Sequence, residues 1–203
     1  AAAHRMRVGV NEKGMPIAWE HRLAQPSILA RWLPDRNEDL TQLERIAAHS
    51  WPKPMLEKRS SSMRGIDPTS TMGFASRSYY AIPDRRLDVA HVRSRVPISI
   101  WRSVGNSGDA FVFESMIDEL AHNAGKDPYE FRRALLAGAP RHRAVLDLVA
   151  EKAGWGGSLY GGHYQGIALD QSFGGICAQV VEISVSGESG LRVHKVVAVL
   201  DCG

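Results

Sequence analysis

Residues 113–121 read Phe-Glu-Ser-Met-Ile-Asp-Glu-Leu-Ala, and this stretch decides much of the fold. Its apolar side chains Phe113, Met116, Ile117 and Leu120 recur at i, i+3, i+4 and i+7, the spacing of one buried stripe on an α-helix. An Ala-Gly pair follows shortly afterwards, and glycine commonly ends a helix. The stretch therefore predicts an amphipathic helix that packs against a core.

Two more helices are predicted directly after this one. Asp127 suits a helix N-cap, Pro128 suits the first helical position, and Glu130 completes a variant of the capping box. Pro140 opens the third helix in the same way, and Gly154 closes it. The chain therefore has three consecutive helices near its centre.

The regions on either side of the helices have the alternation of β-strands. After them, the runs 165–172, 176–185 and 191–200 are strand candidates, with a turn of serines and glycines between the last two. Before them, residues 5–25 predict a hairpin and residues 78–101 a further β region.

Strands grouped before and after a helical block indicate an α+β fold with mixed sheets rather than alternating βαβ units. We expect three parts: β-rich 1–108 with a long irregular loop, the three-helix segment 109–154, and the β-sheet segment 155–203. Within the irregular stretch 26–77, one short helix is expected at 40–48.

Composition excludes several classes of protein. Of the 203 residues, 44% are hydrophobic and 23% charged, which are ordinary values for a globular protein with a sizeable core. The net charge of +3 comes from scattered arginines, without the clustered basic face of a nucleic-acid-binding domain. Cys177 and Cys202 suit neither a disulfide framework nor a zinc site, and the dispersed histidines predict no metal site. No apolar run approaches the ~18–20 residues that span a membrane.

The first candidate site is the stretch 101–108, Trp-Arg-Ser-Val-Gly-Asn-Ser-Gly, which joins a strand to a helix. Small residues let the backbone approach a ligand, and a helix N-terminus presents N–H groups and a positive dipole end to an anion. Arg102 adds a guanidinium with fork geometry. The alternative is an ordinary capped loop with Ser107 or Asp109 as N-cap.

The second candidate is the strand end at 166–175, which finishes in a Gly-Gly bend. Gln171 and Ser172 carry side chains that could hydrogen-bond a ligand there. The alternative is a strand-terminal turn with Gln171 on the surface.

Other polar residues have simpler expectations. Glu114 and Asp118 lie one helical turn apart, as paired acid–base carboxylates would, but they flank an apolar stripe and are expected on a solvated face. Cys177 in an apolar strand is expected to behave as a small hydrophobe. Three histidines have no partner that the sequence names and are expected to be surface or core residues: His91, His122 and His142.

At the two candidate stretches the sequence resembles the molybdopterin-binding large (beta) subunit of isoquinoline 1-oxidoreductase. Related bacterial aldehyde and N-heterocycle dehydrogenases of the xanthine dehydrogenase superfamily share the pattern. The matching motifs follow in order over nearly all 203 residues, most weakly in 30–70. They are Trp101-Arg102-Ser103-Val104-Gly105-Asn106-Ser107 leading to 113–121, Gly125-Lys126-Asp127-Pro128 with Phe131-Arg132, Ala153-Gly154-Trp155-Gly156, Gly166-Ile167-Ala168 with Ser172-Phe173-Gly174, Tyr80-Ala81-Ile82-Pro83, and Val199 with Asp201-Cys202-Gly203.

The resemblance implies a fragment of a molybdenum hydroxylase large subunit, which oxidises an aldehyde or an N-heterocycle with water-derived oxygen. Molybdenum would be held by molybdopterin, in the cytosine dinucleotide form, without a protein side-chain ligand. The implied partners are the remainder of the molybdopterin subunit, a small subunit with [2Fe–2S] clusters, a cytochrome c acceptor and a small-molecule substrate, but no nucleic acid. Related enzymes occur in the bacterial cytoplasm and at the periplasmic face of the inner membrane, so no compartment is predicted.

The implied site residues are carried over position by position. The motif 101–105 matches a loop that reads Phe-Arg-Gly-Phe-Gly in the xanthine dehydrogenase branch and lies against the molybdenum site. Four of its residues are thereby implied to bind the cofactor: Trp101, Arg102, Ser103 and Gly105. The fifth joins the strand end in lining the substrate cavity, which gives Val104, Gln171, Ser172, Phe173 and Gly174.

Departures from the family pattern limit what is implied. Val104 stands where that branch has a substrate-stacking Phe, and no aromatic residue occurs near Ile176, so a purine clamp is not implied. The family's glycine-rich motif is expected before residue 1 and its catalytic Glu after Gly203. No catalytic residue is therefore assigned in this chain, and the segment alone is expected to be inactive.

Two other hypotheses remain open. A non-catalytic interaction domain that retains the fold without the cofactor would account for Ser103 and Val104 in place of Gly and Phe. A binder of anionic ligands or nucleic acid would use the positive net charge, and it predicts steeply salt-dependent binding.

Overall fold

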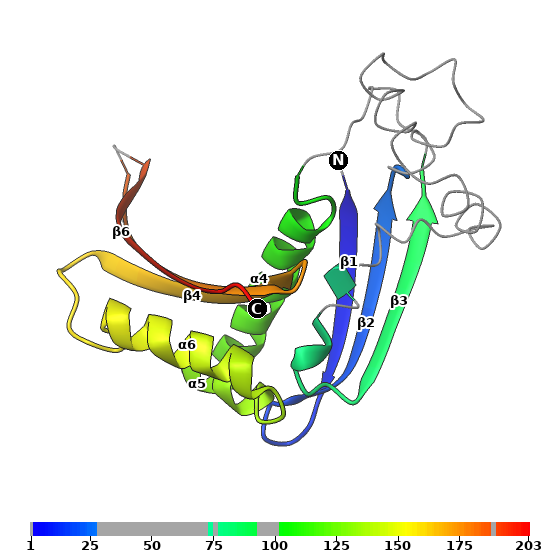
Figure 1. Ribbon diagram of the computed structural model, residues 1–203, viewed down its shortest axis with the longest axis horizontal. Helices are drawn as coiled ribbons and strands as arrows, with labels where there is room; N and C mark the ends of the chain where they lie inside the picture. The colour runs from blue at the N-terminus through cyan, green and yellow to red at the C-terminus, as the bar shows by residue number, and fades with distance from the viewer. Residues whose placement is uncertain (1, 28–72, 75–76, 93–101, 188–189) are drawn as a thin grey trace, which may run out of the picture. The chain divides into compact units, whose positions relative to one another are not determined.

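The computed structural model describes residues 2–27, 73–74, 77–92, 102–187 and 190–203. The predicted helix at 40–48 and the predicted strand residues 93–101 lie outside the described residues. In chain order the elements are β1 (Ala3–Val10), β2 (Pro16–Gln25), η4 (Arg77–Tyr79), β3 (Asp84–His91), α4 (Asn106–Asn123), α5 (Pro128–Leu135), α6 (Pro140–Ala153), β4 (His163–Ser172), β5 (Gly175–Ser186) and β6 (Gly190–Asp201). They form two three-stranded sheets, β1-β2-β3 and β4-β5-β6, with the helices between them in sequence (Figure 1). The predicted α+β class is confirmed.

The chain divides into two compact units, and neither unit is a continuous segment. The first combines Ala1–Val8, Trp19–Ala75 and Arg85–Asp109, and the second combines Gly9–Ala18, Ser76–Asp84 and Ala110–Gly203. The three parts predicted along the sequence are continuous segments, so these discontinuous units do not test them. The three-part division stays a prediction.

The predicted β region at 78–101 is wrong at its start. Arg77–Tyr79 form a 3-10 turn, and β3 begins only at Asp84. Tyr79 and Tyr80 are both buried, whereas consecutive side chains of a strand point to opposite faces. A turn can direct both rings into one core, so burial of the two tyrosines overrides their strand propensity.

The three predicted helices are confirmed, with one change at the start. α4 begins at Asn106, three residues before the predicted 109, and it buries Phe113 and Ile117 as expected. The Asp127 side chain accepts from the N–H groups of Tyr129 and Glu130, so the predicted cap of α5 is present. None of the helices in the described ranges has the length and apolar character needed to cross a membrane.

The second unit is built on the antiparallel sheet β4-β5-β6, with α6 packed against β5 and β6 and α5 packed against α6 (Figure 1). One face of the sheet carries the buried side chains Ile167, Leu169, Ile176, Ala178 and Val180. The period of two that predicted these strands therefore has a physical cause, because alternate residues face the helical layer.

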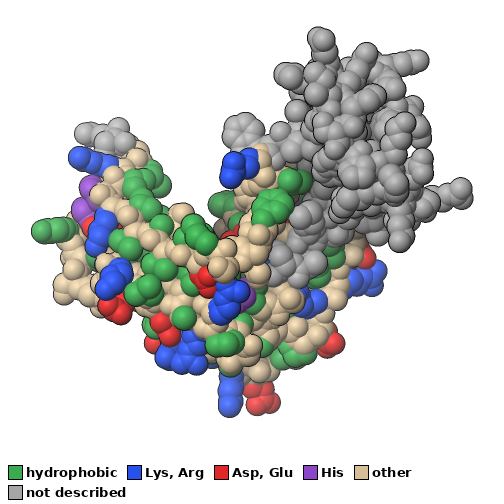
Figure 2. Space-filling view, in the orientation of Figure 1, with side chains coloured by type: hydrophobic (Ala, Val, Ile, Leu, Met, Phe, Trp, Pro, Cys, Tyr) green, Lys and Arg blue, Asp and Glu red, His purple; other side chains and the backbone are tan. Residues whose placement is uncertain are grey.

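Strand β6 lies at the edge of this sheet and is largely exposed. Its large apolar side chains keep half or more of their surface in solvent: Leu191 63%, Val193 52%, Val196 55% and Leu200 64%. Figure 2 shows hydrophobic side chains on the surface of the second unit.

The tip of the β1–β2 hairpin belongs to the second unit and meets the C-terminal end of α4. Gly14 has φ +74, and a Cβ added there would lie 2.6 Å from the Cβ of Ala124, so only glycine fits. The Lys126 ammonium donates to the Lys13 carbonyl oxygen at 2.8 Å. The hairpin tip is therefore fixed by a close backbone approach and a hydrogen bond.

Candidate functional site

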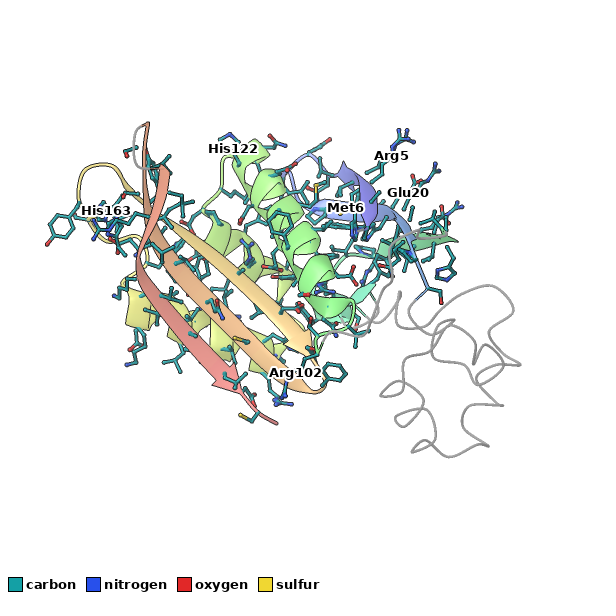
Figure 3. All side chains as sticks on the ribbon, turned by 90° about the horizontal axis from the view of Figure 1, so that it is seen from above. Arg5, Met6, Glu20, Arg102, His122 and His163 are labelled. Atoms are coloured by element: carbon teal, nitrogen blue, oxygen red, sulfur yellow. The ribbon has the colours of Figure 1, made fainter. Side chains whose placement is uncertain are left out.

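The first candidate stretch forms the turn that leads into α4. Arg102 is exposed on this turn and makes no ion pair with another described residue (Figure 3). The Ser103 carbonyl accepts from the Asn106 N–H at 2.9 Å, and the Ser103 hydroxyl donates to the Ser107 hydroxyl oxygen at 2.9 Å. Trp101 lies outside the described residues.

The alternative of a cap at Ser107 or Asp109 is not what the structure shows. α4 already begins at Asn106, so both residues lie in its first helical turn. An acidic residue there still favours the helix, because its charge complements the positive end of the dipole. Residues 103–105 form the turn that precedes the helix.

The second candidate stretch ends in a tight hairpin between β4 and β5. Ser172 pairs with Gly175, which leaves Phe173 and Gly174 as a two-residue turn with φ 52° and 89°. Two positive φ angles define the turn type that joins antiparallel strands most tightly. The bend is therefore at Phe173-Gly174, and the predicted Gly-Gly bend is displaced by one residue because Gly175 is the first residue of β5.

Backbone strain coincides with both candidate stretches. Among the described residues, Val104 and Phe173 are the non-glycine residues with positive φ, at 54° and 52°. This conformation is unfavourable for a β-branched or bulky side chain, and such residues gather at functional sites. Phe173 is also 70% exposed, so its ring does not gain burial in compensation.

The backbone of β4 is held by side chains just before this turn. The Leu169 N–H donates to Glu114 Oε2 at 3.0 Å, and the Leu169 carbonyl accepts from the Tyr79 hydroxyl at 3.4 Å. These contacts come from α4 and η4, two elements far apart in sequence. The backbone groups of Leu169 are therefore satisfied without another strand.

The next two residues of β4 are held by their side chains. Arg77 is fully buried and pairs with Asp170 at 2.7 Å. His142 of α6 lies 2.8 Å from Gln171, measured from ring Nε2 to amide Oε1. The same imidazole stacks on the Tyr79 ring, with centroids 4.3 Å apart. The sequence named no partner for His142, because it lacks any local signal for contacts between residues 29 and more positions apart.

Glu114 corrects a second expectation, because it is buried rather than solvated. It is 5% exposed and pairs with fully buried Arg132, Nε to Oε2 at 2.8 Å. Its other oxygen accepts from the Tyr80 hydroxyl at 3.0 Å. Asp118, at the surface, completes the network through Arg132 Nη1 at 2.6 Å. A carboxylate with all of these partners holds α4, α5 and β4 together.

Asp170 is a titratable group whose pKa this environment changes. Burial raises the pKa of its carboxyl to about 6; Arg77 opposes this rise and the charge of Glu114 adds to it. Asp170 therefore remains mainly ionised at pH 7 and keeps its pair with Arg77, but it takes up a proton in mildly acidic solution.

A cavity of about 360 Å³ lies beside this strand end, between α4 and the sheet. Its wall includes an aromatic ring, carboxylates and a thiol, contributed among others by Phe111, Glu114, Asp118, Leu169, Asp170 and Cys177. The volume is within the ~300–1,000 Å³ of small-molecule sites. The sequence did not indicate this cavity, because its wall joins residues of α4 with residues of β4 and β5.

The predicted site residues fall into two groups. Gln171, Ser172, Phe173 and Gly174 are contiguous in the second unit and follow Asp170, which lines the cavity, but none of the four lines it. The other group belongs to the first unit and consists of Arg102, Ser103, Val104 and Gly105. No group of His, Cys, Asp and Glu side chains in the described part of the chain could hold a metal ion. An exposed guanidinium on a turn of small residues fits an anionic cofactor.

Comparisons with known proteins bear out the resemblance. Residues 60–136 match the family described as the molybdopterin cofactor-binding domain. The chain is 29% identical over 162 residues to the isoquinoline 1-oxidoreductase subunit beta of Brevundimonas diminuta. The matched region covers 78% of this chain and 20% of that protein. The chain thus spans about a fifth of the length of the relative it matches. Its similarity is to a molybdopterin-binding subunit of an oxidoreductase.

Proposed function

We propose that this chain forms part of the cofactor and substrate walls of a molybdenum hydroxylase. The reaction would convert an aldehyde or an N-heterocycle to its hydroxylated product with oxygen from water. The observation that carries the proposal is the strain at Val104 and Phe173. These two residues come from the two stretches that the family resemblance assigns to one active site, and each holds an unfavourable backbone conformation.

The first unit would supply the cofactor contacts. Arg102 would pair with an anionic group of molybdopterin, in the cytosine dinucleotide form, while Ser103 and Gly105 let the backbone approach it. Trp101 belongs to the same proposed set. When bound, the molybdenum group supplies the oxygen transfer and accepts two electrons.

The second unit would supply part of the substrate wall. Gln171 and Ser172 offer hydrogen-bonding groups, and the exposed ring of Phe173 offers an apolar surface for a flat substrate. Val104 would leave more room than an aromatic residue at that position. The catalytic base is assigned to none of these residues, so the segment by itself would be inactive.

The proposed partners follow from the same resemblance. They are the remainder of a molybdopterin subunit, a small subunit with [2Fe–2S] clusters that removes electrons, and a cytochrome c as the final acceptor. A molybdenum group that accepts two electrons from the substrate must pass them on before the next turnover, which is the task of such a relay.

The test is elemental analysis of the chain purified after co-expression with its natural subunit partners. About one molybdenum per chain is expected. Arg102→Ala should lower the molybdenum content severalfold, because a charge-assisted contact to the cofactor is lost. The matched control is Arg192→Ala on exposed β6, which should retain the metal.

The second candidate function is a non-catalytic interaction domain, which Ser103 and Val104 favour because they replace the Gly and Phe of the family loop. It predicts a complex that assembles with no molybdenum. A metal-free complex would therefore replace the first proposal with this one.

A further inference from the structure

We infer that the cavity between α4 and the sheet β4-β5-β6 is a binding site for a flat aromatic cation with N–H donors. The site is separate from the stretches assigned above to cofactor and substrate, since none of the described residues of those stretches lines it. The inference concerns the second unit alone and does not depend on the molybdenum chemistry.

The floor of the cavity is the face of the sheet that α6 leaves open. Ala168 is in register opposite Gln179, Asp170 is opposite Cys177, and all four residues line the cavity. They alternate along β4 and β5 with the buried residues that face the helical layer. The sheet therefore presents a small patch of mixed polar and apolar side chains on its open side.

One side of the cavity is formed by α4, which lies along β4 (Figure 3). Phe111, Ser115 and Asp118 line it at i, i+4 and i+7, the spacing of one helix face. Glu114 on the same side binds the Leu169 N–H and so fastens the helix to the strand. Phe111 is 74% exposed, so its ring is available to a ligand.

The charge of the lining selects a cation. Three carboxylates line the cavity, Glu114, Asp118 and Asp170, whereas no Lys, Arg or His does so among the described residues. Arg77 and Arg132, which are fully buried, pair with these carboxylates and supply two positive charges against three negative ones. The side chain of Asp118 is 47% exposed, so its carboxylate can accept a hydrogen bond from a ligand.

The remaining features of the cavity select a flat aromatic molecule. A volume of about 360 Å³ is enough for a compound of one or two rings. The Phe111 ring can stack on such a compound, and an aromatic face attracts a cation in addition. An amidinium or guanidinium group on an aromatic ring combines the positive charge, the N–H donors and the flat shape.

The test is titration of the 203-residue chain with benzamidine, followed by the ¹⁵N–¹H signals of its backbone amides. The signals of Ser115, Ala168 and Gln179 should move, with a Kd of about 1 mM, as expected of so small a ligand. Benzoate has the same ring with the opposite charge and should move none of them. Equal binding of benzoate would overturn the selection by charge.

Acetamidine, a cation without a ring, should bind at least about tenfold more weakly than benzamidine. Equal affinity would show that the cavity takes any amidinium group, such as the end of an arginine side chain, and would overturn the aromatic assignment. A second hollow, beside the start of α5, also combines carboxylates with an aromatic ring and is lined by Asp127 and Trp155. Benzamidine shifts confined to these two residues would overturn the assignment to the cavity.

Charge variants at Gln179 test the site without disturbing the fold, because this side chain is exposed. Gln179→Lys should weaken benzamidine binding about tenfold, and Gln179→Glu should strengthen it severalfold, since the cation then meets one charge more of either sign. Ala144→Lys on the exposed side of α6 is the matched control and should bind as wild type does. Unchanged affinity in both Gln179 variants would overturn the proposal.

The pH dependence tests the contact with Asp170. Benzamidine stays cationic from pH 7 to pH 5, whereas Asp170, with a pKa of about 6, takes up a proton over this range. Affinity should therefore fall by up to about tenfold at pH 5. An unchanged or higher affinity would overturn this contact. The charged and titratable groups around Asp170 are Arg77 and Tyr79 of η4, Glu114 and Asp118 of α4, and Cys177 of β5.

Discussion

The two edges of the sheet β4-β5-β6 are stabilised in different ways. At the edge strand β4, side chains from α4 and η4 bind both backbone groups of Leu169, and the next two residues contact buried Arg77 and half-buried His142. Strand β6 pairs with β5, is bound at its end by Arg141 of α6 through Asp201, and exposes apolar side chains along its length. Buried charges are costly, and the molecule places them where the strand leads into the candidate site. The comparison shows that the buried polar contacts of this sheet are concentrated at the end of β4.

The largest expected effect is on the ion pair behind the β4 edge. Arg132→Met should lower the free energy of unfolding by roughly 3–5 kcal/mol, because it leaves Glu114 charged and buried without its cation. Urea denaturation measures the loss. The double variant Arg132→Met with Glu114→Gln should recover part of it, and a double variant no better than the single one would contradict the pairing argument.

Asp170→Asn should have the next largest effect, because buried Arg77 loses a charged acceptor. The cost of burying the Asp170 charge, which raises its pKa, offsets part of this, so the loss at pH 7 should be roughly 1–2 kcal/mol. The pKa of Asp170 is raised from 3.8 to about 6 in the fold, so the folded state binds a proton that the unfolded state does not bind between these values. The stabilisation that this proton uptake gives the folded state is fully present below pH 3.8 and is lost as the pH rises through about 6.

The wild-type advantage over Asp170→Asn should therefore widen as the pH falls from 7 to 5. Urea denaturation at both pH values tests this sign. A gap that narrows in acid would mean that the Arg77 pair keeps the pKa of Asp170 below its ordinary value.

Phe173→Gly should raise the free energy of unfolding by about 1 kcal/mol, because glycine adopts the positive φ of this turn without strain. Val196→Gly on β6, where the backbone is ordinary, is the matched control and should destabilise by a similar amount. In the assembled enzyme Phe173→Gly should also weaken substrate binding. Loss of stability in Phe173→Gly would remove the argument from strain.

The smallest effect is expected on the open edge. Val196→Lys should change the free energy of unfolding by less than about 0.5 kcal/mol, because the side chain is 55% exposed. The same change at Val180, which is 2% exposed, should prevent stable folding. A large loss of unfolding free energy in Val196→Lys would show that β6 is covered in the isolated chain.

Local features of the fold were the ones that the sequence could predict. The cap at Asp127 and the stop at Gly154 depend on neighbours within a few residues, and both are present. The first turn of α4 was missed because residues 106–108 lack an apolar pattern. The 3-10 turn at Arg77–Tyr79 was missed because its cause is burial of two adjacent rings in a distant core.

The candidate site was predictable only in its location. Family motifs indicated the residues around Arg102 and Gln171, and the motif around Gln171 lies next to a cavity. They did not indicate the buried contacts of Glu114, His142 or Asp170, since the partners of these residues come from elements far apart in the chain. Charge and ring partners across such distances are decided by packing, which a single sequence does not display.

The hairpin tip at Gly14 has a consequence for the order in which the molecule can be made. Residues 9–18 complete the second unit, yet their contact partners Ala124 and Lys126 are synthesised more than a hundred residues later. During translation the hairpin must wait for α4 before its tip can dock, and closing so long a loop slows folding. The hairpin tip is therefore synthesised long before the residues against which it packs.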